Sequence, residues 1–257
     1  MPAQFDLSRL SVRQFAERFR ADMIPLSNTF SYFCASVPMS EEDLKEYLEE
    51  PVAALPPAIG AALPKISILL VPYLERGGEA EKKKAPAHVA PASDYVSIER
   101  PPEGRISNFT HLKVGEETVL AFALKDQEVA EYHYRFYHVL ASLMSEHCGE
   151  QVATRYEHLL REEFTADIHG EVDEPSWRLK QAIRRSQAGR AKGFHGYARQ
   201  SFADTLTLYL HGICCDIDVD TGPRQLPSRY LRRRLLMLQE IYPAPSGYAV
   251  FPEELES

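Results

Sequence analysis

The spacing of apolar residues changes at about Asp126, and this change divides the chain into two parts of different character. Before Asp126, short apolar runs are separated by connections that contain Pro and Gly, which is typical of strands joined by turns. After it, apolar residues recur at helical spacing, as at Tyr132, Phe136 and Leu140. The pattern predicts an α+β fold with a larger, mostly α-helical C-terminal half.

The first part, residues 1–125, is predicted to combine N-terminal helices with a small antiparallel β-meander. A helix is expected over residues 8–22, and Ser40 begins a capping-box pattern that opens a second, short helix before Pro51. Residues 75–93 are rich in Gly, Ala, Pro and Lys, so we expect a flexible loop there. Three strands form the predicted meander, and a fourth can join it: 95–99, 105–112 and 118–124, with 66–74.

The second part, residues 126–257, is predicted to contain five helices and one short strand. Gly212 stands where a left-handed helix C-cap is expected, and residues 213–219 alternate as a strand would. The helices are expected over 126–148, 151–164, 175–187, 194–211 and 228–242. The two parts form either two domains or one continuous domain, since 257 residues suit both arrangements.

Composition places the chain among ordinary soluble proteins, with 44% hydrophobic and 26% charged residues. The longest apolar run, residues 66–71, is far too short to span a membrane. The first residues show no basic and apolar pattern of a secretory signal, and the four cysteines lack the CxxC spacing of metal knuckles. We therefore expect a cytoplasmic protein without a membrane partner.

Charge is divided unevenly along the chain. Residues 176–239 hold twelve Lys and Arg against four Asp, a net charge of +8, while the whole chain carries −8. The remainder must therefore carry −16. Such a division indicates either an intramolecular match between basic and acidic parts or a surface that meets an anionic partner.

The basic residues suggest a partner-binding face. Arginine makes bidentate contacts to carboxylates and phosphates, and the candidate residues are Arg229, Arg232, Arg233 and Arg234 on the last helix, with Arg184 and Arg185. A protein partner of acidic or mixed charge, or a second copy of the chain, would suit this face. Nucleic acid is not favoured, because the pI is about 5.6 and no nucleotide-binding motif occurs.

Two acidic clusters suggest a divalent metal. Asp216 and Asp218 would share one face of the predicted strand, and Asp167 and His169 stand in a loop that could wrap around an ion. The alternative for the first pair is a solvated strand edge. For Asp167 and His169 the alternative is a run of acidic residues that precedes a helix N-terminus, where acidic residues are favoured without any ligand.

A third group combines His211 with Asp204 and with the adjacent Cys214 and Cys215. His211 and Asp204 are separated by about 10 Å of helix rise, so they could bracket a substrate but cannot hydrogen-bond directly. His211 is the obvious base for a nucleophilic thiol, whereas a small apolar filler is the alternative role for one of the two cysteines.

No motif fixes an activity, and the sequence leaves open whether the protein is an enzyme. Two hypotheses follow from the clusters. The first is an interaction or accessory protein that docks an acidic or mixed-charge partner through the basic helix. The second is a metal-dependent hydrolase or nuclease that uses the carboxylate and histidine cluster.

Overall fold

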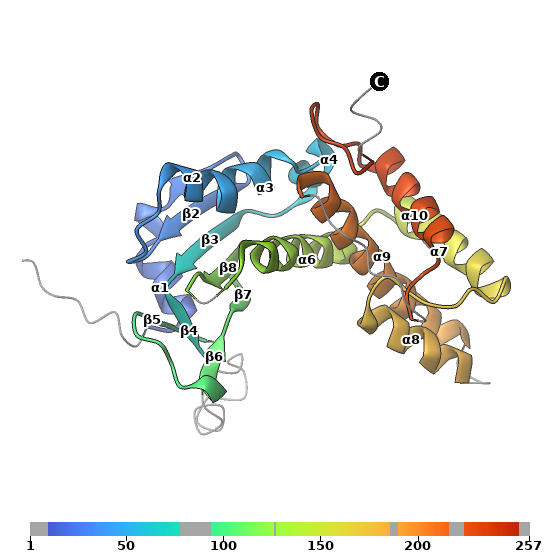
Figure 1. The fold of residues 1–257 in the computed structure, drawn as a ribbon, viewed down its shortest axis with the longest axis horizontal. Coiled ribbons are helices and arrows are strands. Elements are labelled where there is room, and N and C mark those ends of the chain that lie inside the picture. The colour runs from blue at the N-terminus through green and yellow to red at the C-terminus, as the bar shows by residue number, and fades with distance from the viewer. Residues whose placement is uncertain (1–9, 78–93, 126, 186–189, 216–223, 252–257) are drawn as a thin grey trace, which may run out of the picture. The chain divides into compact units, whose positions relative to one another are not determined.

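The computed structural model describes residues 10–77, 94–125, 127–185, 190–215 and 224–251. The chain forms two compact units, coloured along the sequence in Figure 1. The first unit comprises Met1–Glu49 and Pro64–Tyr132, and the second comprises Glu50–Leu63 and His133–Ser257. The predicted α+β class is confirmed, as is the mostly helical C-terminal half. The predicted loop at 75–93 lies almost entirely outside the described residues.

The first unit contains short helical segments and two small sheets. Its strands are β1 (Ile24–Pro25), β2 (Phe30–Cys34), β3 (Ile66–Val71), β4 (Tyr73–Glu75), β5 (Tyr95–Ser97), β6 (Ile106–Ser107), β7 (Phe109–Val114) and β8 (Glu117–Ala123). Its helical segments are α1 (Val12–Arg18), η1 (Arg20–Asp22), α2 (Glu41–Leu44), the π-helical η2 (Lys45–Glu49) and η3 (Glu103–Arg105). The large sheet has the order β1-β2-β3-β8-β7, and the small sheet has the order β5-β4-β6.

Strand β3 lies at the centre of the large sheet and explains why this sheet is mixed. All six of its residues are buried, as is typical of a parallel strand covered on both faces. It runs parallel to β2 and to β8, with Ile68 opposite Tyr32 on one side and Leu120 on the other. The expected hairpin of β7 and β8 is antiparallel. The connectivity differs from a simple meander, because β5 and β6 both pair with β4 in the second sheet.

Helix capping in the first unit follows the sequence closely. Ser11 begins α1 and Ser40 begins α2, each with a complete capping box. The expected break at Pro51 does not occur. Instead, η2 leads into a further helical segment in which Pro51 is buried. The π-helical η2 lies directly before Pro51, and such a local change in helical hydrogen bonding can accommodate a residue that has no N–H to donate.

The second unit is a bundle of helices. These are α3 (Glu50–Ala53), α4 (Pro57–Ala62), α6 (Val129–His147, whose first four residues belong to the first unit), α7 (Glu150–Thr165), α8 (Glu174–Arg185), α9 (Arg190–Cys214) and α10 (Ser228–Ile241). Helix α9 packs against α7, α8 and α10 and forms the middle of the unit (Figure 1). Its buried residues Phe202, Leu206 and Leu210 recur at helical spacing, as the sequence predicts.

The end of α9 differs from the prediction and creates the site described below. Gly212 does not cap the helix. The backbone N–H of Cys215 donates to the carbonyl of His211 at 2.8 Å, so the helical hydrogen bonding continues past the glycine. Ile213 is buried, and its burial favours this continuation. The predicted strand at 213–219 is therefore wrong at its first residues, and residues 216–219 lie outside the described part.

Among the residues that the structure describes, none of the helices has the length and apolar character needed to cross a membrane.

Candidate metal centre

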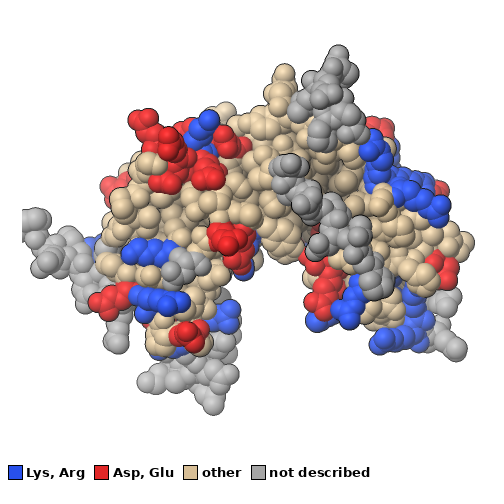
Figure 2. Space-filling view, viewed as in Figure 1, with Lys and Arg blue, Asp and Glu red and all other residues tan. Residues whose placement is uncertain are grey.

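Helix α10 carries four of the predicted partner-binding arginines, and these four differ in their exposure to solvent. Arg229, Arg232 and Arg233 are exposed, whereas Arg234 is 0% exposed. Figure 2 shows Lys and Arg side chains gathered over α10 and α8 of the second unit. Arg234 therefore cannot be part of a docking surface in this structure, and its assignment to that face is corrected.

Arg234 belongs to a buried ionic network that joins α7, α8 and α10 with the loop between α7 and α8. Its guanidinium donates to Glu163, and it also donates to Glu171 at 2.7 Å. The ammonium of Lys180 donates to the same Glu171 at 2.9 Å. All four charged side chains are at most 1% exposed. Two cations therefore face two carboxylates, and the charges are balanced inside the unit, as burial requires.

The backbone around Glu171 explains how a loop carboxylate reaches this network. The Glu171 N–H donates to the carbonyl of Arg224 at 2.9 Å. Gly170 has a φ of +79°, and a Cβ atom there would lie 2.0 Å from the carbonyl oxygen of Gln225. Only glycine permits this close approach. Burial alone would raise the pKa of Glu171, but the charges of Arg234 and Lys180 lower it to about 2.

Other basic residues of the second unit are also matched by nearby acids. Arg233 pairs with Glu162, and Arg184 pairs with Asp167 at 3.0 Å. Arg185 is exposed. Much of the basic segment thus neutralises carboxylates of its own unit, which is the intramolecular match that the charge division allowed.

The carboxylates and histidine predicted to hold a metal are placed less favourably. Asp167 and His169 lie 3.9 Å apart, but their side chains are 78% and 75% exposed. Arg184 contacts both of them, and its positive charge opposes a cation at that point. Asp216 and Asp218 lie outside the described residues.

A different group of metal-ligating side chains converges at the end of α9. His211 and Cys215 stand one helical turn apart and face His133 of α6. One ligand atom from each residue lies within 4.8 Å of the other two. The Sγ atom of Cys215 is 3.2 Å from Nδ1 of His133. His133 is 6% exposed, and the other two side chains are partly buried.

Aromatic side chains and a second thiol surround this group. The ring of Tyr137 lies 6.0 Å from that of His211, and its hydroxyl donates to the carbonyl of Pro51 at 3.1 Å. The rings of Tyr134 and His211 are 6.3 Å apart. A hydrogen bond with Cys215 lowers the pKa of the Cys214 thiol to about 7. The packing of Tyr137 between α3 and His211 limits the freedom of the imidazole.

The protonation of His211 suits metal binding. Burial and the neighbouring His133 lower the pKa of His211 to about 4. Its imidazole is therefore neutral at pH 7 and has a nitrogen lone pair available, which is the form that ligates metals.

The donor set fits a zinc-like ion. Zn–S and Zn–N bonds of about 2.3 and 2.0–2.1 Å in tetrahedral geometry place ligand atoms roughly 3.3–3.6 Å apart. The observed 3.2 Å between sulfur and nitrogen is close to this spacing. The other separations are at most 4.8 Å, so they need to shorten by up to about 1.5 Å to reach it. Imidazole and thiolate are ligands that zinc and copper prefer over the oxygen donors favoured by magnesium or calcium.

Sequence reasoning found part of this group but not all of it. His211 was placed beside Cys214 and Cys215, yet the predicted strand separated Cys215 from the helix. The useful signal was the four-residue spacing of His211 and Cys215, which puts both on one face if the helix continues. His133 comes from another helix, and nothing in its spacing links it to residue 211.

Comparison of the chain with family models, with curated proteins and with solved structures finds no match. The function is therefore argued from the residues of this chain alone.

Proposed function

We propose that this protein binds a divalent transition metal, with zinc the best fit, through His133, His211 and Cys215, and that it acts as a metal-dependent hydrolase. The observation that carries this proposal is the convergence of three metal-ligating atoms within 4.8 Å of one another from two helices. The site takes the place of the carboxylate and histidine cluster that the sequence suggested.

Three protein ligands converge within the part of the chain that the structure describes, and this number favours a catalytic role over a structural one. Structural zinc sites close the coordination shell with four protein ligands, whereas catalytic sites use three and leave one position for water. His133, Cys215 and the neutral imidazole of His211 would hold the ion. A zinc ion held in this way would supply a nucleophile at neutral pH, because it lowers the pKa of bound water to about 7. A thiolate ligand must also stay reduced, so the proposal places the protein in a compartment such as the cytoplasm.

Metal titration tests the binding step. The protein is stripped with a chelator and titrated with Co²⁺ as a spectroscopic probe, with Zn²⁺ and then Cu²⁺ as competitors. We expect one equivalent of Co²⁺ and a thiolate-to-metal charge-transfer band in the near ultraviolet. In Cys215→Ser the band should vanish and the affinity should fall by about 100-fold or more, since a ligand is lost outright.

Cys148→Ser is the matched control, because Cys148 is a partly buried thiol of the same unit outside the group. It should bind Co²⁺ as the wild type does. A protein that binds no stoichiometric metal, or that binds it equally well as Cys215→Ser, would show the proposed site to be wrong.

Hydrolysis is tested separately with p-nitrophenyl acetate and bis-p-nitrophenyl phosphate. We expect turnover that needs Zn²⁺ and disappears in His211→Ala. Stoichiometric binding without any turnover of either compound would leave a metal-binding protein and contradict the hydrolase assignment.

The exposed part of α10 supports a second proposal, an interaction or accessory role. Arg229 and Arg232 are exposed, and Leu236 beside them is 44% exposed. Arginines around an exposed apolar residue are typical of interface surfaces. We propose that this surface docks an acidic or mixed-charge protein or a second copy of the chain.

Native mass measurement over a range of salt concentrations tests this second proposal. For self-association, Arg229→Glu with Arg232→Glu should convert an oligomer to a monomer, and salt should weaken the oligomer of the wild type. Arg178→Glu on α8 is the control. For a heterologous partner, the protein that co-purifies with the wild type should be identified and lost from the double variant. An assembly that resists both charge reversals would contradict the proposal.

A further inference from the structure

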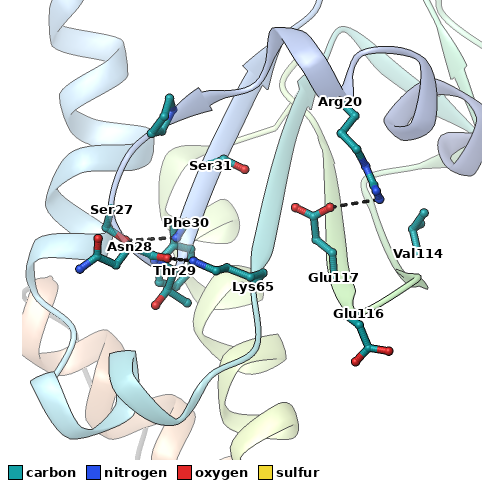
Figure 3. A pocket seen from close by; sticks show the side chains of 11 residues that line it. Arg20, Ser27, Asn28, Thr29, Phe30, Ser31, Lys65, Val114, Glu116 and Glu117 are labelled. Carbon is teal, nitrogen blue, oxygen red and sulfur yellow. Dashed lines mark hydrogen bonds and ion pairs between the residues drawn. The ribbon is translucent and has the colours of Figure 1, made fainter.

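The first unit contains a pocket that the proposed metal chemistry does not use. It has a volume of about 440 Å³, within the range of small-molecule sites. The pocket lies where the parallel strands β2, β3 and β8 begin, between the turn before β2 and the turn before β8. Figure 3 shows side chains from both turns and from the strand ends around it.

Charged groups of both signs border this pocket in equal number. Arg20 and Lys65 supply two cations, and Glu116 and Glu117 supply two carboxylates. Figure 3 shows Arg20 pointing toward Glu117, with 3.4 Å between the guanidinium and the carboxylate, while the ammonium of Lys65 donates to the carbonyl of Asn28. The charges of the lining residues therefore sum to zero, but the positive and negative groups stand at different places around the pocket.

Glu117 is held in a fixed orientation by a chain of hydrogen bonds across the sheet. Its Oε1 atom accepts a hydrogen bond from Ser67, which is 1% exposed. Ser67 in turn lies 3.1 Å from the hydroxyl of Ser31. The Oε2 atom of Glu117 faces Arg20. A carboxylate whose two oxygens are both oriented pays little entropy when it receives a ligand.

We propose that this pocket binds a small zwitterion of the free α-amino acid class. The ammonium group of the ligand would pair with Glu117, and its carboxylate would pair with Lys65. Pro25, Phe30 and Val114 supply apolar surface for a side chain. A ligand of a single sign would face like charges on one side of the pocket, whereas a zwitterion matches both.

Binding requires the contact between Arg20 and Glu117 to loosen, and this costs little. The side chain of Arg20 is 58% exposed and that of Glu117 is 25% exposed. Exposed ion pairs contribute little to stability. The carboxylate can therefore exchange a guanidinium for an ammonium at small cost, while Ser67 keeps its orientation.

Ligand-observed NMR and calorimetry with the metal-free full-length protein test the proposal. The probes are glycine, L-leucine, L-phenylalanine, L-glutamate and L-lysine. Two derivatives of leucine isolate the charges: N-acetyl-L-leucine lacks the ammonium, and L-leucinamide lacks the carboxylate. We expect saturable binding of at least one amino acid, and at least tenfold weaker binding of either derivative if leucine binds. If another amino acid binds instead, its own acetyl and amide derivatives replace those of leucine.

Variants locate the binding in the pocket. Glu117→Gln keeps an acceptor for Ser67 but removes the charge, and Lys65→Met removes the exposed ammonium. Each should weaken binding at least tenfold. The matched controls Glu99→Gln and Lys113→Ala alter exposed charges of the same unit outside the pocket and should leave binding unchanged.

The proposal is overturned if no probe binds saturably, if a blocked derivative binds as well as its parent, or if the pocket variants bind like the controls. Lys65 is exposed, so the variant Lys65→Met should fold. Its affinity for the amino acid therefore tests the proposal even if Glu117→Gln is unstable. Metal enters none of these measurements, so failure here and failure of the metal centre are distinguishable.

Discussion

Two groups of ionisable side chains lie in the same helical unit and differ in whether the protein itself compensates their charges. In the network of Arg234, Glu163, Glu171 and Lys180, each charge is buried against an opposite charge. At the proposed metal centre, two imidazoles and one thiol converge on one point, and the described residues place no carboxylate among these three groups. The buried network balances its charges with protein groups alone. The three metal-ligating groups would have a positive charge between them only if they bound a metal ion. Matched burial thus indicates a structural role, and convergence of donors indicates a site.

Removal of one member of the matched network should destabilise the protein strongly. Arg234→Met keeps an unbranched apolar side chain but removes the guanidinium, which leaves Glu163 and Glu171 with less compensation. We expect the free energy of unfolding to fall by about 3–5 kcal/mol, because an uncompensated buried charge remains. Urea denaturation measures this change.

Arg233→Met is the matched control for that experiment. Arg233 is the next residue on α10, but its side chain is 50% exposed and pairs with Glu162 at the surface. Its replacement should cost about 1 kcal/mol or less. Equal losses in the two variants would mean that burial of the network contributes nothing beyond a surface ion pair.

Acid should also weaken the network selectively. The pKa of Glu171 is lowered from 4.5 to about 2 in the folded protein. The stability that this carboxylate contributes is therefore fully present above pH 4.5 and is lost as the pH falls toward 2. The difference in unfolding free energy between wild type and Glu171→Gln, measured by urea denaturation, should be constant near pH 7 and shrink below pH 4.5. A difference that stays constant down to pH 2.5 would contradict the charged state assigned to Glu171.

The metal centre should respond in the opposite way, by gaining stability from an added ligand. A ligand that binds only the folded state stabilises it by about 2.7 kcal/mol at a concentration of 100 times Kd. We expect Zn²⁺ to raise the thermal midpoint of the wild type and of Arg233→Met, but not that of Cys215→Ser. Stabilisation of Cys215→Ser to the same extent would place the zinc elsewhere on the chain.

The sequence predicted local features well and contacts between helices poorly. Capping at Ser40 and a strand that begins at Ile66 depend on neighbouring residues, and both were predicted. The burial of all six residues of that strand was not predicted. The parallel pairing of that strand with β2 and β8 joins segments 36 and 52 residues away, and the local pattern carries no signal for it. The His133 contact with Cys215 spans 82 residues and was missed for the same reason.

The burial of Arg234 can be predicted from its position among the apolar residues of α10. At 100° per residue, this arginine falls between Leu231, Leu235 and Leu238, on the buried face of α10. Glu163 on α7 and Lys180 on α8 stand on the buried faces of their helices in the same way. Charged residues of both signs on apolar faces predict a buried pair. Three consecutive arginines predict an exposed basic surface, but the middle of the apolar face takes one of them inward.

Cys215 should contribute little to the stability of the protein when no metal is bound. In the metal-free protein, Cys215→Ser replaces a partly buried thiol with a group of similar shape. It should change the free energy of unfolding by about 1 kcal/mol or less, since a ligand contributes to stability only when the metal is bound. Chelator-treated wild type and variant, compared by urea denaturation, should therefore nearly coincide and separate only after Zn²⁺ is added. A loss of several kcal/mol without metal would mean that Cys215 supports the helical packing itself, as Arg234 does, and the convergence at the end of α9 would then be structural.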